Sequence, residues 1–346
     1  MILRLFATLL VLPTVAVALE VQQVELSLDQ DPPPDPLISE ASLVRVGKPG
    51  KSPSNRTLLG LPYSAGLELR AGYDSNVILA AKDNSDLASN AHSATLGATL
   101  RGSLTLVSGE KGTVMVGGDT GYNANPSVHS ADLARLGGYV TGYMRIKSLT
   151  VGVNGGATRY QETSPAWDGA ANVGYGTVFF SYETKRHIVL ATFGLTKLNL
   201  DSNENSSGVR FDASPRWWLL FEESIMSRRL ELITRYTRMA ALADYRSYRA
   251  GVLGAGIVYR FGEKQTAGTI DMDARIGHEW RIYDTDVSAA EREQQRLLSA
   301  TGNLDWWLSS WVSIGPYLGL EHRVGSPQEF VNYDRWYAGL RSHLIF

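Results

Sequence analysis

Apolar and polar residues alternate along most of the chain. Residues 332–346 show the pattern: Trp336 and Phe346 occupy even-numbered positions, and Arg335 and Arg341 occupy odd-numbered ones, so the two kinds of residue fall on opposite faces, or parities, of a strand. Alternation with a period of two predicts β-strands with one apolar and one polar face. Fourteen segments carry the pattern: 63–73, 91–107, 113–123, 132–147, 149–162, 169–184, 187–199, 209–222, 228–240, 246–262, 266–284, 295–309, 311–325 and 333–346.

Short and long gaps between these segments follow one another in strict order. Residues 148 and 185–186 are short gaps, whereas 74–90 and 285–294 are long ones. This order is typical of an outer-membrane β-barrel, which has short periplasmic turns and longer outer loops. An even number of strands places both ends of the barrel in the periplasm.

The predicted fold is therefore all-β, a transmembrane antiparallel up-and-down β-barrel over residues 62–346. We expect about 14 strands, an even number as in bacterial barrels. Twelve or sixteen strands stay open, because segments 169–184 and 228–240 alternate weakly.

Alternation would also fit a soluble sandwich with its apolar face inward. Two features favour the inverted arrangement, in which apolar side chains meet lipid. Strands of 11–17 residues are long for a sandwich. Aromatic residues also gather near segment ends, as in the girdles at membrane interfaces. The predicted girdle residues are Tyr73, Trp217, Trp280, Trp306, Trp336 and Phe346. A spanning sheet must close on itself, because lipid leaves an open edge unsatisfied.

The N-terminus carries a different pattern. Arg4 is followed by the apolar run 5–17 and by a small-residue site at Ala18, which predicts a secretory signal peptide over residues 1–18. Residues 19–61 include a proline-rich tract, which favours extended, unpaired backbone. We interpret this segment as a periplasmic arm or a plug.

Composition narrows the function further. The net charge of −2 argues against a nucleic-acid partner. The chain has no cysteine, which excludes disulfides, thiolate metal sites and cysteine nucleophiles. Its six histidines do not recur at ligand spacing, and no Gly-x-Ser-x-Gly elbow is present. We therefore predict no catalytic site, no metal and no cofactor. A lipid-modifying barrel enzyme and a non-conducting anchor are the alternatives from other classes.

The polar parity predicts a charged lumen that contacts the solute. The candidate residues are Arg70, Arg101, Arg135, Arg145, Arg210, Arg216, Arg275, Arg281, Arg335, Arg341, Asp271, Asp273, Tyr139 and Tyr337. In one interpretation these charges pair across neighbouring strands and stiffen the wall. In the other, the excess of arginine gives a mildly positive lumen that favours anionic solutes.

The stretch "GYDSNV" at residues 72–77 ends the first predicted strand, after the proline-rich arm. It resembles a motif of the β-barrel porin type 2 group, and the resemblance implies an outer-membrane barrel tied to exopolysaccharide or capsule secretion. The terminal Phe346 on an alternating strand resembles the signal read by the outer-membrane barrel assembly machinery. Outer-membrane lipid, that machinery, a polysaccharide and periplasmic secretion proteins are thus the expected partners.

The function predicted from these features is a channel in the bacterial outer membrane that exports a secreted polysaccharide through an arginine-rich lumen. A general diffusion porin, or a channel for hydrophobic substrates plugged by residues 19–61, is the alternative of the same class.

Overall fold

The structure is a computed structural model. It describes residues 57–58, 60–76, 92–109, 111–128, 132–162, 169–200, 207–223, 225–242, 246–262, 265–284, 294–326 and 332–346. The predicted signal peptide, 1–18, and all but the last residues of the predicted arm lie outside these ranges. Among the described residues, no helix has the length and apolarity needed to cross a membrane.

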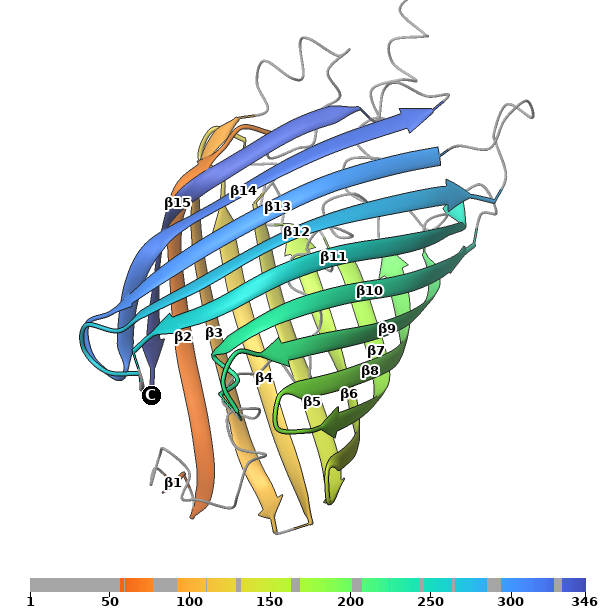
Figure 1. The fold of residues 1–346 in the computed structure, drawn as a ribbon. Coiled ribbons are helices and arrows are strands. Elements are labelled where there is room, and N and C mark those ends of the chain that lie inside the picture. Colours follow the sequence, from red (N-terminus) through yellow and green to blue (C-terminus); the bar gives the residue numbers. More distant parts are fainter. Residues whose placement is uncertain are drawn as a thin grey trace, which may run out of the picture.

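Fourteen antiparallel strands close into one barrel (Figure 1). Each strand pairs with its neighbours in sequence, and closure comes from the pairing of the first strand, β2, with the last, β15. The short β1 (Thr57–Leu58) pairs only with the start of β2. The barrel strands are β2 (Leu61–Asp74), β3 (Ser93–Ser108), β4 (Gly112–Ala124), β5 (Leu133–Ile146), β6 (Leu149–Glu162), β7 (Gly169–Glu183), β8 (His187–Leu200), β9 (Gly208–Leu220), β10 (Arg228–Ala241), β11 (Tyr248–Phe261), β12 (Ile270–Tyr283), β13 (Gln294–Trp307), β14 (Val312–Ser326) and β15 (Tyr333–Ile345).

The predicted all-β barrel and its strand number are confirmed. The weakly alternating segments 169–184 and 228–240 are full strands, β7 and β10. Their weak alternation has a physical cause: part of their inward face is apolar, as in Phe179 of β7 and Met239 of β10, which are both buried. The inward face is therefore partly apolar in this part of the wall.

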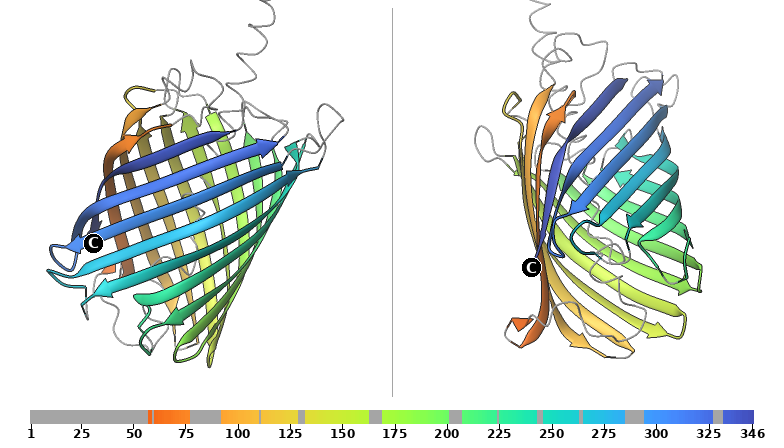
Figure 2. Two further views of the ribbon diagram at one scale, coloured as in Figure 1. Left: turned by 45° about the horizontal axis from the view of Figure 1, so that its top comes forward. Right: turned by 60° about the vertical axis from the view of Figure 1, so that its left-hand side comes forward.

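The barrel has two walls of different tilt (Figure 2). Strands β2 to β6 run steeply in Figure 1, whereas β10 to β15 are strongly inclined to them, and the wall bends between these groups through β7 to β9. The short connections, such as that between β5 and β6, lie at one end of the barrel, which we call the turn end. The long connections lie at the opposite end, the loop end.

Candidate functional site

The inward face of the barrel is identified by ion pairs that skip a strand. The Arg341 guanidinium on β15 contacts Asp305 on β13 at 2.5 Å. Arg275 on β12 contacts Glu231 on β10 at 3.3 Å. A closed barrel brings side chains two strands apart together on its concave face, so these residues point into the lumen. The strict alternation of strands then assigns an inward parity to every strand.

All the predicted lumen residues lie on this inward parity. Most of their arginines contact a carboxylate. Arg135 and Arg335 do so across neighbouring strands, as the first interpretation expects, whereas several others pair within their own strand. Arg335 pairs with Asp74 of β2 at 2.6 Å, and Arg210 pairs with Asp212 of its own strand at 2.8 Å. The further pairs are Arg70–Glu68, Arg135–Asp119, Arg145–Glu183, Arg275–Asp273 and Arg281–Glu279. Asp271 accepts two hydrogen bonds from Arg260 and one from the Trp307 indole.

Solvent reaches some of these arginines and not others. Arg70 and Arg275 have side chains 45% and 39% exposed, and Arg101 is exposed as well. All three lie toward the middle of their strands. In contrast, the Arg281 side chain is only 5% exposed and lies over the Tyr248 ring, 4.2 Å from its centroid. The lumen is therefore open to water along β2, β3 and β12. Contact of the predicted residues with a solute stays a prediction.

Two apolar clusters fill part of the lumen, and the sequence analysis missed both. The first lies at the loop end of β6 to β11 and contains Tyr160, Ala171, Val173, Leu198, Leu200, Met239, Tyr248 and Ala250. The second lies at the turn end of β7 to β9 and contains Phe179, Ile188, Leu190, Trp218 and Leu220. The sequence signal was the weak alternation of β7 and β10, which contribute to these clusters. The second cluster occupies the bent part of the wall, and the first extends from it onto β6, β10 and β11.

Lumenal tyrosines lie along the charged part of the wall and cover glycines of the neighbouring strand. The Tyr337 ring occupies the space that a side chain at Gly319 would need. Tyr139 covers Gly117 in the same way. Tyr317 and Tyr337 are close, with ring centroids 6.4 Å apart. Because each ring fills its neighbour's empty position, the tyrosines add aromatic surface to the wall and project little into the lumen.

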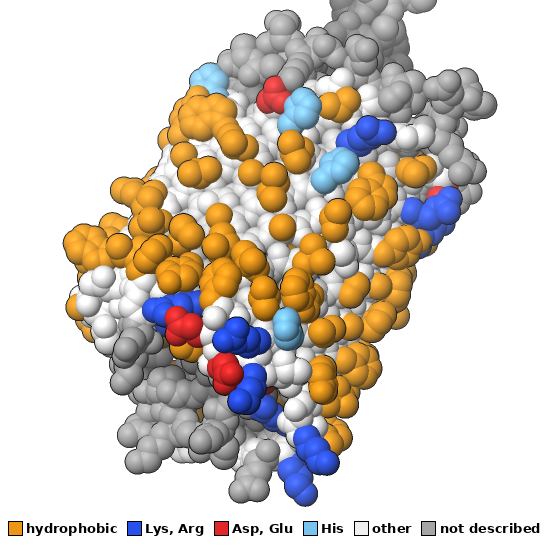
Figure 3. All heavy atoms as spheres, in the orientation of Figure 1, with side chains coloured by type: hydrophobic (Ala, Val, Ile, Leu, Met, Phe, Trp, Pro, Cys, Tyr) orange, Lys and Arg blue, Asp and Glu red, His pale blue; other side chains and the backbone are white. Residues whose placement is uncertain are grey.

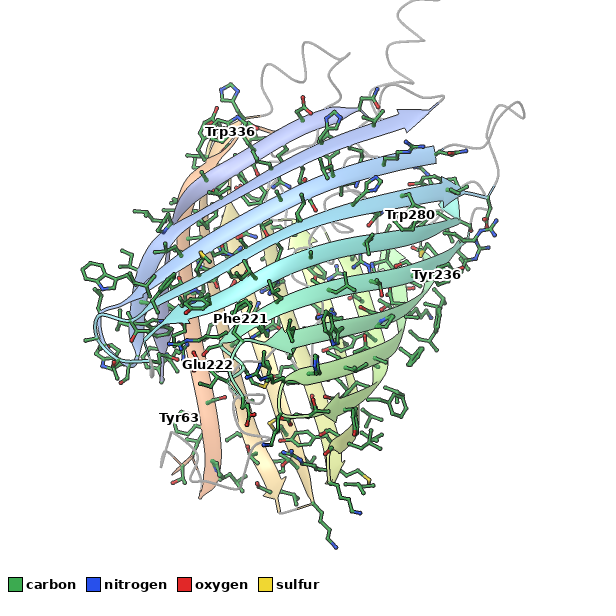
Figure 4. All side chains as sticks on the ribbon, in the orientation of Figure 1. Tyr63, Phe221, Glu222, Tyr236, Trp280 and Trp336 are labelled. Carbon is green, nitrogen blue, oxygen red and sulfur yellow. The ribbon has the colours of Figure 1, made fainter. Side chains whose placement is uncertain are left out.

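The outward face is apolar. Leu136, Leu195 and Leu340 are among many large apolar side chains exposed there. In Figure 3, hydrophobic side chains spread over the visible outer surface, and charged ones gather toward its rims. The predicted girdle residues Tyr73, Trp217, Trp280, Trp306, Trp336 and Phe346 are all exposed. In Figure 4, Trp280 and Trp336 lie on the loop-end side, and Phe221 on the turn-end side.

A closed antiparallel barrel with an apolar outer surface and a charged, hydrated interior fits a lipid environment, not water. This chain is a β-barrel of the bacterial outer membrane. Within the described ranges, no group of three or more His, Asp or Glu residues is placed to hold a metal ion.

No protein-family model and no curated protein matches the chain. Several solved structures are similar in fold. An anion-selective porin from Comamonas acidovorans matches over 83% of this chain and 99% of its own, at 9% identity and a TM-score of 0.46. A bacterial polysaccharide outer membrane secretin matches over 82% and 98%, at 8% identity and a TM-score of 0.42. OmpT of Vibrio cholerae matches over 83% and 97%, at 7% identity and a TM-score of 0.44. Similarity at this level carries no argument about function.

Proposed function

We propose that this barrel is a passive channel for anionic hydrophilic solutes and that its cargo is a secreted polysaccharide. The observation that carries the proposal is the exposure of Arg70, Arg101 and Arg275 inside the barrel. A guanidinium that water reaches in the middle of a lumen is available to a passing anion. The sequence holds no nucleotide-binding motif, so the driving force comes from concentration or from synthesis on the inner side.

The paired charges limit how positive the lumen is. Because most of the arginines contact a carboxylate, the wall attracts anions modestly, and it presents many polar groups that hydrate a solute. Such a wall suits a chain that slides past, since tight binding at any one position would slow its exit.

The lumenal tyrosines support the proposal that the solute is a sugar chain and not only small anions. Tyr139 and Tyr337 line the charged part of the wall as flat aromatic surfaces beside hydrogen-bonding side chains. Apolar ring faces of a sugar pack against aromatic surfaces, while its hydroxyl groups bond to arginine and carboxylate groups. Because the two apolar clusters fill part of the lumen, we expect a hydrated solute to pass along the charged wall.

The test is ion conductance of the purified full-length protein in planar bilayers. We expect steady conductance with a preference for anions, measured from the reversal potential in a salt gradient. Replacing Arg70, Arg101 and Arg275 together by glutamine should reduce that preference. The matched control is Arg186→Gln, which removes an exposed cation from a turn outside the lumen and should leave the preference unchanged. A wild-type protein that conducts no ions would refute the channel.

A second measurement separates polysaccharide export from general diffusion. An anionic oligosaccharide, oligogalacturonate, is added to one side of the bilayer, and a neutral dextran of equal length serves as control. We expect oligogalacturonate to interrupt the current more often and for longer, and Tyr337→Ala to shorten the interruptions. A barrel that conducts ions but responds equally weakly to both chains is a general porin.

A further inference from the structure

Three arginines form a cationic cluster on the outside of the barrel at its loop end. Arg238 of β10 and Arg249 of β11 are directly opposite each other in the strand register. Arg296 of β13 lies opposite Trp280 of β12. All three have the outward parity of their strands. We call them the loop-end arginine cluster.

Among the described residues, this cluster has an excess of positive charge. Like charges directly opposite each other on a sheet repel, and only Asp284 offsets them in the described part of the chain. Asp284 contacts Arg238 at 2.5 Å and Arg249 at 3.7 Å. Arg296 is exposed and has no ion pair with a described residue. The Arg249 side chain is half exposed. Within the described ranges, Asp284 is the carboxylate that contacts the cluster, and it contacts Arg238 and Arg249 but not Arg296, so the cluster is complementary to an anion.

Exposed aromatic residues lie directly beside the cluster, on the side of the apolar band. Tyr236 and Trp280 flank Gly251 on the outer surface, and both are exposed. The Trp280 ring lies over the bare backbone of Gly251. Figure 4 shows both aromatic side chains at the loop-end margin of β10 to β12. Trp and Tyr residues of this kind lie at the membrane–water interface. They therefore indicate that the arginine cluster lies near that interface.

Arg238 follows Tyr236 by two residues on the same strand, and Arg249 precedes Gly251 by two. Two residues advance a strand by about 7 Å. Arg238 and Arg249 thus lie just beyond the interfacial aromatics, and Arg296 is level with Trp280 in the strand register, so the cluster lies where the apolar band meets the lipid headgroups. The long loops place this end of the barrel on the outer side of the membrane.

We propose that the loop-end arginine cluster binds the phosphate groups of a phosphorylated glycolipid in the outer leaflet. Arginine suits this ligand because its planar donors bind phosphate oxygens in a bidentate manner. Trp280 and Tyr236 contact the sugar and the upper part of the acyl chains. A membrane lipid fits better than a soluble anion, because Tyr236 and Trp280 lie next to the cluster in the strand register and are exposed (Figure 4). The site is separate from the lumen and does not depend on the proposed channel.

The experiment measures lipid retention by the full-length protein in native mass spectrometry. Lipid A is the probe, phosphatidylcholine is the uncharged comparison, and inorganic phosphate tests binding without a lipid. The variants are Arg249→Gln and Arg296→Gln, separately and combined, with Arg186→Gln as the control for an exposed cation at the turn end. Heat-dependent migration on a gel verifies that each variant is a folded barrel. Arg249→Lys with Arg296→Lys keeps the charge and provides a second folded comparison.

We expect wild type and Arg186→Gln to retain lipid A in preference to phosphatidylcholine. Each glutamine variant should bind lipid A about fivefold more weakly, which corresponds to about 1 kcal/mol per basic residue near the surface. The lysine variant should retain more lipid A than the double glutamine variant. Equal retention by wild type and the double glutamine variant would overturn the proposal. Displacement of lipid A by inorganic phosphate at equal concentration would reassign the cluster to soluble anions.

Discussion

Replacing Asp74 by asparagine should weaken the seam where the barrel closes. The ladder between β2 and β15 has nine residue pairs, compared with fourteen between β11 and β12. It ends at Asp74, where Arg335 donates from Nε and Nη2 to Oδ2 at 2.9 and 2.6 Å. Asp74 is only 3% exposed, and its Oδ1 also accepts the backbone N–H of Asn76 at 2.9 Å. The carboxylate thus holds the last strand and the start of the first loop.

The expected loss follows from what asparagine keeps and what it removes. The amide oxygen still accepts from Asn76, but the charge that Arg335 contacts is gone. Removing one member of a buried ion pair costs about 3–5 kcal/mol when the remaining charge has no other partner. Here Arg335 retains Glu321, whose Oε2 lies 3.5 Å from Nη1. The loss should therefore be nearer the value of a hydrogen bond to a charged group, about 2 kcal/mol.

The assay is reversible unfolding of the full-length protein in urea with lipid vesicles, followed by tryptophan fluorescence and by heat-dependent migration. Asp334→Asn is the matched control, because Asp334 lies at the loop end of β15, near the same seam. It pairs with His322 at 2.6 Å, and its side chain is 57% exposed. An exposed pair of this kind contributes less than about 1 kcal/mol. If Asp74→Asn and Asp334→Asn reduce the free energy of unfolding equally, the argument that burial at the seam determines the loss is wrong.

Three further substitutions test other parts of the barrel. Phe179→Ala should lower the free energy of unfolding by about 3–5 kcal/mol, since its ring is fully buried in the turn-end cluster; a loss below about 1 kcal/mol would mean that the cluster is loosely packed. Gly315→Ala should cost about 1–3 kcal/mol, because the new Cβ collides with the Leu304 carbonyl oxygen, whereas Gly174→Ala meets no neighbouring atom and should be neutral in the same urea titration. Phe346→Ala should reduce the amount of protein in the outer membrane of cells, while the purified, refolded variant keeps the heat-dependent migration of wild type.

The strand pattern was predictable because one physical constraint repeats in every strand. Lipid outside and water inside impose opposite requirements on successive residues, and this alternation is visible without any alignment. The predicted segment 149–162 coincides with β6, and 133–146 of β5 lies inside the predicted 132–147. The largest boundary difference is at β12, which begins at Ile270 and not at 266, because residues 266–269 form a turn in which Gly268 has a φ of +87°.

The partners of the lumenal charges were not predictable. Parity gives the face of a side chain, but it does not give the register between strands. Arg335 and Asp74 are 261 residues apart in sequence, and they meet only because the last strand closes on the first. The "GYDSN" part of the motif gains a structural role from this closure. Ser75 pairs with the backbone of Trp336, and the Asn76 amide donates to the Asp334 carbonyl oxygen. These bonds continue the seam beyond the ladder.

The apolar clusters and the charged wall follow from one geometric feature, the bend of the barrel at β7 to β9. Where the wall bends sharply, inward side chains of neighbouring strands converge and exclude water, so apolar residues such as Leu190 and Trp218 pack there as in a soluble core. In the rest of the wall the inward side chains are largely charged, and the buried ones, such as Arg281 and Glu279, pair with each other, whereas Arg70 and Arg275 are reached by water. The apolar clusters thus limit where water can enter the lumen. A substitution such as Leu190→Arg at the bend should destabilise the protein without adding to the anion preference of the channel.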